Sequence, residues 1–149
     1  MSIVPTNVNY NSLLMLQNLI ILNRTYPFFN IQAVGNSVLG KNIYVVKLGR
    51  GSKEVFYSAS IHSNEWITSV LLMKFIEDYC VAYVNNSNLY GYSVRNLFNT
   101  VSIYIMPMVN PDGVDLVTGF LNPFSPAYLK AQNISHQFPD IPFPSRMES

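Results

Sequence analysis

The alternation of hydrophobic and polar positions follows a helical period in some stretches of the chain and a strand-like pattern in others. Residues 10–25 have helical spacing, which predicts an amphipathic helix with the apolar face Leu13, Leu14, Leu16, Leu19, Ile20 and Leu22. Tyr26-Pro27 ends this helix, because the residue before a proline is disfavoured in the helical region. Residues 28–34 and 43–48 are strand-like, and the turn 35–41 between them contains two glycines suited to positive φ, so an antiparallel hairpin is predicted.

The middle of the chain predicts a strand, a helix and a second strand. Residues 54–60 are β-branched, aromatic and small, which is typical of a buried strand, and residues 66–84 carry a wide apolar stripe at helical spacing. After a polar break, residues 92–98 form a short predicted helix and 100–106 a β-type strand. A strand, helix and strand in this order imply a right-handed crossover and parallel pairing, so the predicted fold class is α/β.

The pattern weakens after residue 114. Residues 127–133 favour one or two helical turns, whereas the prolines of residues 138–144 exclude a helix or a central strand.

His62 and Glu65 are the first candidate for chemistry. His62 follows the strand 54–60, and Glu65 lies in the first turn of the next helix. Ligands of open α/β sheets bind beyond the carboxyl ends of the strands, and zinc accepts imidazole nitrogen and carboxylate oxygen. The spacing therefore indicates half of a zinc site. The alternative is a surface histidine near a glutamate that stabilises a helix N-terminus through the dipole.

Composition narrows the class of protein. The 149 residues form one domain by length, with 49% hydrophobic residues, 11% charged residues and a net charge of +1, so nothing indicates nucleic acid or an acidic membrane surface as a partner. The one cysteine, Cys80, lies on the apolar stripe of the central helix and is predicted to be a core residue. No secretory signal is visible, and residues 13–22 are too short to cross a bilayer. As written, the chain would be cytoplasmic, and its true compartment stays open.

Three motifs follow one another along the chain: Gly35-x-Ser-x-x-Gly-Lys-x-Ile43, His62-Ser-Asn-Glu-Trp-Ile-Thr68 and Pro107-Met-Val-Asn-Pro-Asp-Gly113. Together they resemble the zinc carboxypeptidases of the M14 family, over residues 26–144. The pattern with Asn64, where digestive carboxypeptidases carry arginine, is more similar to the bacterial γ-D-glutamyl-L-diamino acid peptidases that cleave peptidoglycan stem peptides. The resemblance implies the N-terminal half of that family's mixed twisted sheet, flanked by helices.

The resemblance also implies roles for individual residues. His62 and Glu65 match the family's first two zinc ligands, so Zn²⁺ is the expected cofactor and a peptide or peptidoglycan stem peptide the expected substrate. Trp66 and Thr68 match residues that pack the start of the following helix. The residues matching a turn beside the site are Asn110, Pro111, Asp112 and Gly113, which by themselves favour a plain type I or II turn over direct chemistry.

The match does not extend to the rest of the family's site. The third zinc ligand, a histidine on a later strand, and the glutamate that acts as general base have no counterpart in this sequence. His136 lies in a proline-edged segment and is predicted to be a loop residue, and Glu77 is predicted to lie on the solvated face of the central helix beside Lys74. Glu148 has no supporting pattern.

Residues 1–149 are therefore expected to be a partial peptidase domain, an incomplete copy whose activity alone is doubtful. A non-catalytic remnant or peptide-binding module is the alternative, and an unrelated α/β domain with a chance His-x-x-Glu is a third interpretation. A sheet that stops midway exposes an edge strand and an apolar face, so self-association through that face is also expected.

Overall fold

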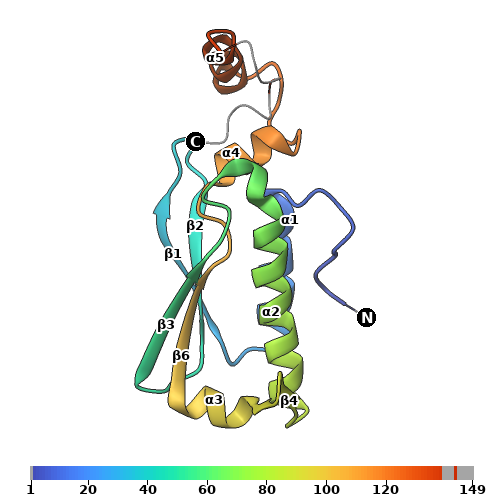
Figure 1. Ribbon diagram of the computed structural model, residues 1–149, viewed down its shortest axis with the longest axis vertical. Coiled ribbons are helices and arrows are strands. Elements are labelled where there is room, and N and C mark those ends of the chain that lie inside the picture. The colour runs from blue at the N-terminus through green and yellow to red at the C-terminus, as the bar shows by residue number, and fades with distance from the viewer. Residues whose placement is uncertain (1, 139–142, 144–149) are drawn as a thin grey trace.

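The computed structural model describes residues 2–138 and residue 143. Its main sheet is four-stranded and mixed, and the strands lie in the order β1 (Asn30–Asn36), β2 (Asn42–Leu48), β6 (Val101–Met106) and β3 (Lys53–Ser58) (Figure 1). β2 pairs antiparallel with both β1 and β6, whereas β3 pairs parallel with β6. The predicted α/β class, the hairpin and the parallel strand pair are thus confirmed. Only Gly40 of the two hairpin-turn glycines has positive φ, at 79°.

Two long helices lie side by side along one face of this sheet, α1 (Ser12–Thr25) and α2 (Trp66–Val84) (Figure 1). Between them and the strands lies the core, to which β2 and β6 contribute Val46, Leu48, Ile103 and Ile105. The short helices are η1 (Ser63–Glu65), α3 (Val94–Thr100), α4 (Pro111–Val117) and α5 (Pro126–Ser135), and a small hairpin joins β4 (Asn88–Leu89) and β5 (Tyr92–Ser93). None of the helices in the described part of the chain is long and apolar enough to cross a membrane.

The buried face of α1 differs from the predicted one. Leu13 and Ile20 are exposed, whereas Met15 and Asn18 are buried. Asn18 tolerates burial because its side-chain amide donates a hydrogen bond of 2.8 Å to the hydroxyl of Tyr10, which is itself fully buried. The period of the apolar residues located the helix correctly. Because its leucines and isoleucines lie on more than one face, the period did not identify which face is buried.

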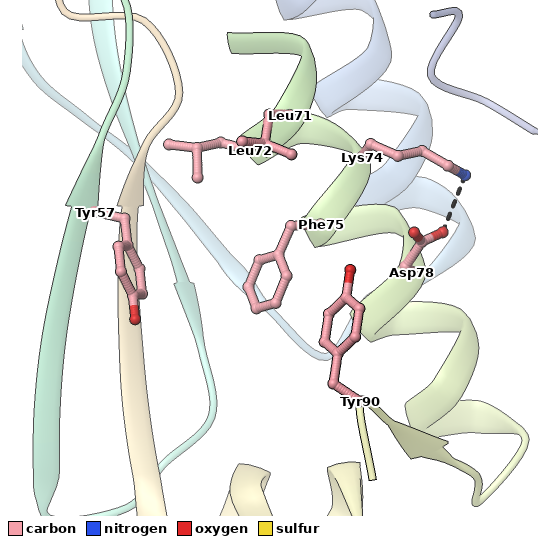
Figure 2. A pocket seen from close by; sticks show the side chains of 7 residues that line it. All are labelled: Tyr57, Leu71, Leu72, Lys74, Phe75, Asp78 and Tyr90. Carbon is pink, nitrogen blue, oxygen red and sulfur yellow. Dashed lines mark ion pairs between the residues drawn. The ribbon is translucent and has the colours of Figure 1, made fainter. Parts of the chain in front are cut away.

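Strand β3 was predicted to be buried, and this is wrong: all of its residues are exposed. In the described structure β3 pairs only with β6, so its other edge has no neighbouring strand. A cavity of about 380 Å³ also separates β3 from α2. Figure 2 shows Tyr57 of β3 facing Leu72 and Phe75 of α2 across this space, and Tyr90 closing its lower end. Apolar composition identified the strand, but exposure depends on what packs against it.

Glu77 was predicted to lie on a solvated face, and this is also wrong, since its side chain is buried. Its carboxylate accepts hydrogen bonds from the backbone N–H groups of Ile3, at 2.6 Å, and Val4, at 3.3 Å. The hydroxyl of Ser2 and the ammonium of Lys74 both donate to it at 2.9 Å. The N-terminal segment therefore covers this face of α2, and its backbone groups find their partner there.

Candidate functional site

The chain turns sharply where β3 ends, and hydrogen bonds from the start of α2 hold the turn. Ser60 adopts a positive φ of 51°, which is uncommon for a residue with a side chain. Its backbone N–H donates to the hydroxyl of Thr68 at 2.9 Å, and that hydroxyl donates to the carbonyl oxygen of Glu65 at 2.7 Å. The Ser60 hydroxyl lies 2.6 Å from that of Ser69. Thr68 thus holds the beginning of α2, as the sequence predicted, and Trp66 packs against the core.

The two candidate ligands belong to one short 3₁₀ turn. His62 is the N-cap of η1 and Glu65 its last residue, and the Glu65 N–H donates to the His62 carbonyl oxygen at 3.2 Å. This hydrogen bond closes the turn and keeps the backbones of residues 62 and 65 close together. Both are exposed, while Ser63 between them is buried.

The segment that follows β6 is joined directly to this turn. Beyond the last paired residues of the parallel strands, the N–H of Ala59 donates to the Met106 carbonyl at 3.0 Å, and Val109 donates to the Ala59 carbonyl at 2.9 Å. The N–H of Asn110 then donates to the Ser60 carbonyl at 3.0 Å. The carboxyl ends of β3 and β6 thereby meet at one rim, where ligands of open α/β sheets bind.

The Asn-Pro-Asp-Gly segment is the first turn of α4 and not the isolated turn that the sequence favoured. Asn110 is the N-cap, and its side-chain oxygen accepts from the Gly113 N–H at 2.9 Å. Pro111 occupies the first helical turn, where its missing N–H costs nothing. The Asn110 side-chain amide donates to the Ile61 carbonyl at 3.4 Å, so the residue caps one helix and contacts the ligand-bearing segment.

Two carboxylates of α4 attach it to the β1–β2 hairpin. Asp112 accepts hydrogen bonds of 2.9 Å from the Ser37 hydroxyl and the Leu39 N–H. Lys41 forms ion pairs with Asp112 at 3.2 Å and with Asp115 at 2.7 Å. The Gly35–Ile43 motif that the resemblance singled out therefore has a structural role, as the partner of α4.

Asp115 was not identified from the sequence. It is fully buried and accepts from the Ser12 N–H at 2.7 Å and the Ser12 hydroxyl at 2.6 Å, so it also fixes the start of α1. A buried aspartate is a candidate for a catalytic carboxylate. The oxygens of Asp115, however, accept hydrogen bonds from Ser12 and Lys41, which gives this carboxylate a structural role. The signal that could have found it is Lys41, a cation in a turn with no counterion nearby in sequence.

The chemistry of His62 and Glu65 suits zinc, which binds imidazole and carboxylate. The described residues contain no group of three or more His, Cys, Asp or Glu side chains that could hold a metal ion. Cys80 lies fully buried in the hydrophobic core, where burial, with a contribution from the charge of Glu77, raises the pKa of its thiol to about 12. His136 lies far along the chain, at the end of α5. The donors therefore fit two protein positions of a zinc site.

Comparison with known proteins decides the family. The family model described as zinc carboxypeptidase (peptidase M14) matches residues 15–133. The chain belongs to the zinc carboxypeptidase family. Among curated relatives, it is 42% identical over 109 residues to γ-D-glutamyl-L-diamino acid endopeptidase 1 of Lysinibacillus sphaericus, covering 73% of this chain and 28% of that protein. It is 45% identical over 94 residues to an uncharacterized Bacillus subtilis protein, YqgT, covering 62% of this chain and 25% of the relative.

Solved structures of zinc carboxypeptidases share the fold. The crystal structure of thrombin-activatable fibrinolysis inhibitor (TAFI) superposes with a TM-score of 0.67 at 21% sequence identity, over 79% of this chain and 30% of that one. The chain thus spans roughly a quarter of its curated relatives, at 28% and 25% of their lengths. Both the resemblance and the fold that it implied are confirmed, and the family as such implies zinc.

Proposed function

We propose that this chain provides part of a zinc-dependent peptidase centre, with His62 and Glu65 as two of the protein ligands. The observation that carries the proposal is the position of both residues on one 3₁₀ turn, at the rim where β3 and β6 end. Imidazole and carboxylate are ligand types that a catalytic zinc binds. Here both lie on a hydrogen-bonded turn, which helps to keep the ligands in place. Membership of the zinc carboxypeptidase family supports the same assignment.

Zinc, when bound, polarises a peptide carbonyl and acidifies a coordinated water, which is the chemistry of peptide hydrolysis. The chain's own contribution is to hold the metal beside the parallel strand ends. A catalytic zinc usually has three protein ligands, so the proposal requires a third from outside residues 2–138 and 143, together with a group that transfers the proton. In this sense residues 1–149 represent a partial peptidase domain.

The proposed substrate is a peptide of the bacterial cell wall. The relative that is 42% identical is a γ-D-glutamyl-L-diamino acid endopeptidase, and its similarity covers 73% of this chain. Asn64, next to the ligand Glu65, is the residue in which the sequence resembles that branch. A stem peptide containing a γ-D-glutamyl bond to a diamino acid is accordingly the first peptide to test.

A zinc titration tests the metal site. The wild-type chain and the His62→Ala and Glu65→Ala variants are titrated with Zn²⁺ by calorimetry, with His136→Ala as matched control. We expect both ligand variants to bind zinc at least tenfold more weakly and His136→Ala to bind as the wild type does. Equal binding by wild type and His62→Ala would remove the basis of the proposal.

A non-catalytic peptide-binding module is the second candidate, favoured by the lack of a three-ligand group among the described residues. Incubation of the zinc-loaded chain with the stem peptide distinguishes the two functions. Zinc-dependent cleavage, followed by mass spectrometry, supports hydrolysis. Peptide binding that saturates without cleavage, and that Glu65→Ala weakens, supports the binding module.

A second copy of the chain is a further proposed partner, at the open edge of β3. An exposed strand edge presents unpaired backbone groups to other chains. Antiparallel pairing of two β3 strands keeps Lys53 and Glu54 of one copy away from the same residues of the other, whereas parallel pairing places like charges together. The antiparallel arrangement is therefore the proposed one.

A further inference from the structure

Ser63 is the buried residue of the turn that carries the two ligands. His62, Asn64 and Glu65 are exposed, and Ser63 among them is 1% exposed. Hydrogen bonds from Thr68 and Ser60 hold the Glu65 carbonyl at the end of the turn, and what lies against Ser63 sets the position of the turn from the interior. Backbone hydrogen bonds fix the chain just before the turn, but the side chain of Ser63 is the point at which the turn itself enters the protein interior.

The residue that lies against Ser63 is Gly113 of α4. A Cβ atom added to Gly113 would lie 2.9 Å from both the Cβ and the Oγ of Ser63, and 2.6 Å from the Asn110 Nδ2. Real Cβ atoms do not approach other atoms so closely, so a side chain at residue 113 would have to displace a neighbour. The Asn110 amide can withdraw only by giving up its hydrogen bonds with the Gly113 N–H and the Ile61 carbonyl. Ser63 Cβ is attached to the backbone of η1 and cannot move unless the turn moves.

Gly113 also stands in a position where glycine is otherwise unfavourable. It lies within α4, and glycine inside a helix is less favourable than alanine. Its φ is not positive, so backbone conformation does not require glycine there. The close approach of Ser63 and of the Asn110 amide is the physical reason for a glycine at this point of the helix.

The helix that carries Gly113 is itself firmly held. Asp112 bonds to Ser37, Leu39 and Lys41 of the β1–β2 hairpin, and Asp115 bonds to Lys41 and to Ser12. If a side chain is placed at residue 113, α4 therefore cannot shift to make room for it. The exposed turn that contains Ser63 moves instead.

We propose that Gly113 and Ser63 are positioning residues for the metal. Their contact sets the positions of His62 and Glu65, so the size of the side chain at residue 113 of α4 controls zinc affinity. This inference rests on the proposed zinc site. Neither residue supplies a ligand, and the contact acts through the turn between the two ligands. Residues that orient metal ligands typically change affinity by about 10–100-fold when they are replaced.

The test is a double-mutant cycle of Gly113→Ala and Ser63→Gly, read as zinc affinity by calorimetry. Gly113→Ala is expected to weaken zinc binding at least tenfold in the wild-type background. In the Ser63→Gly background the Cβ and Oγ of Ser63 are gone and only the Asn110 amide remains crowded, so the same change is expected to weaken zinc binding less than threefold. Gly35→Ala is the matched control, because nothing lies within 4 Å of its added Cβ, and it should leave zinc affinity unchanged.

A second measurement separates positioning from a general loss of stability. The ring ¹⁵N resonances of His62 in the metal-free protein should shift in Gly113→Ala and return toward the wild-type positions in the double variant. If the Gly113→Ala variant alone does not fold, the double variant carries the test. The contact is supported if the double variant folds and its zinc affinity is within threefold of that of the Ser63→Gly single variant. A protein that stays unfolded in the double variant overturns it.

The outcomes distinguish this inference from the function on which it rests. A wild-type chain that binds zinc through His62, with Gly113→Ala binding equally well, overturns the positioning role alone. An equal loss of affinity from Gly113→Ala in both backgrounds overturns it too. Zinc binding that does not depend on His62 removes the proposed site, and the positioning role with it.

Discussion

The carboxylate of Glu77 fixes the N-terminal segment to the middle of α2. It accepts two backbone N–H groups and a hydroxyl from residues 2–4 and an ammonium from Lys74, although only 3% of the residue is exposed. Burial acts to raise the pKa of this carboxyl, but the hydrogen bonds from Ile3, Lys74, Ser2 and Val4 outweigh it, so the pKa lies below its usual value. The charged form is therefore favoured by the fold.

Replacing this carboxylate should destabilise the protein. We expect Glu77→Gln to lower the free energy of unfolding by about 1–3 kcal/mol, because buried donors lose a charged acceptor. Urea unfolding measures the change. Asp78→Asn is the control, since Asp78 pairs with the same Lys74 at 3.0 Å but its side chain is 40% exposed, and its loss should cost no more than about 0.5 kcal/mol. Equal losses in the two variants would contradict the anchoring role.

The same residue should give a pH dependence of defined sign. Because folding lowers the pKa of Glu77, its contribution is complete above the usual glutamate pKa of about 4.3 and is lost as pH falls through the lower folded value. The stability difference between wild type and Glu77→Gln should persist from pH 7 to pH 5 and shrink toward pH 3. A difference that grows on acidification would contradict this assignment.

At the scale of elements, the ligand-bearing rim depends on links between segments far apart in sequence. Asp115 joins α4 to the start of α1 and, through Lys41, to the β1–β2 hairpin. These contacts hold α4 against η1, with which it packs closely at the end of the sheet where α2 begins (Figure 1). The position of the candidate ligands therefore relies on residues that are not themselves proposed to bind the metal.

We expect Asp115→Asn to lower the free energy of unfolding by about 1.5–3 kcal/mol, because charge-assisted hydrogen bonds to Ser12 and Lys41 are lost. Lys41→Met should cost less in the Asp115→Asn background than in the wild type, since the partner charge is then already absent. Chemical denaturation of the four proteins gives the coupling. Strictly additive effects would argue that the 2.7 Å ion pair contributes nothing.

Local sequence pattern predicted the elements better than their environments. Periodicity and β-branched composition located α1, α2, the hairpin and the parallel pair, because these signals are properties of neighbouring residues. Helix α4 was missed, since Asn110 to Gly113 fit a turn equally well until the contact with Ser63 is known. The exposure of β3 and the burial of Glu77 depended on distant partners, which no short window contains.

The candidate ligands could be located for the same reason that the elements could. His62 and Glu65 follow a strand and open a helix, which is local information. The residues that hold the turn and the rim are Ser63, Asp115 and Lys41. They act through contacts between segments far apart in sequence, and Ser12 and Asp115, for example, are separated by 103 positions.

For the molecule as a whole, the described sheet is open at both edges, which are formed by β1 and β3. The outer edge of β3 has no strand beside it in the described structure, and Val55, Phe56 and Tyr57 are exposed along it. Low charge content, at 11%, offers little repulsion between copies. Self-association is the expected consequence at high protein concentration.

Phe56→Lys should reduce this association, because a lysine on an exposed edge strand opposes pairing with another strand. Sedimentation velocity over a range of concentrations measures the effect. Val38→Lys is the matched control, since Val38 is 99% exposed but lies in the β1–β2 turn. A wild-type chain that stays monomeric, or equal effects of the two lysines, would exclude association through β3.

The central claim, that His62 and Glu65 bind zinc, is tested most directly by ¹⁵N NMR of the imidazole rings, because the chain has only two histidines. On addition of Zn²⁺ the ring resonances of His62 should shift and those of His136 should not, and Glu65→Ala should require a much higher zinc concentration for the same shift. Unchanged His62 resonances, or equal shifts of both histidines, would contradict the proposed metal site.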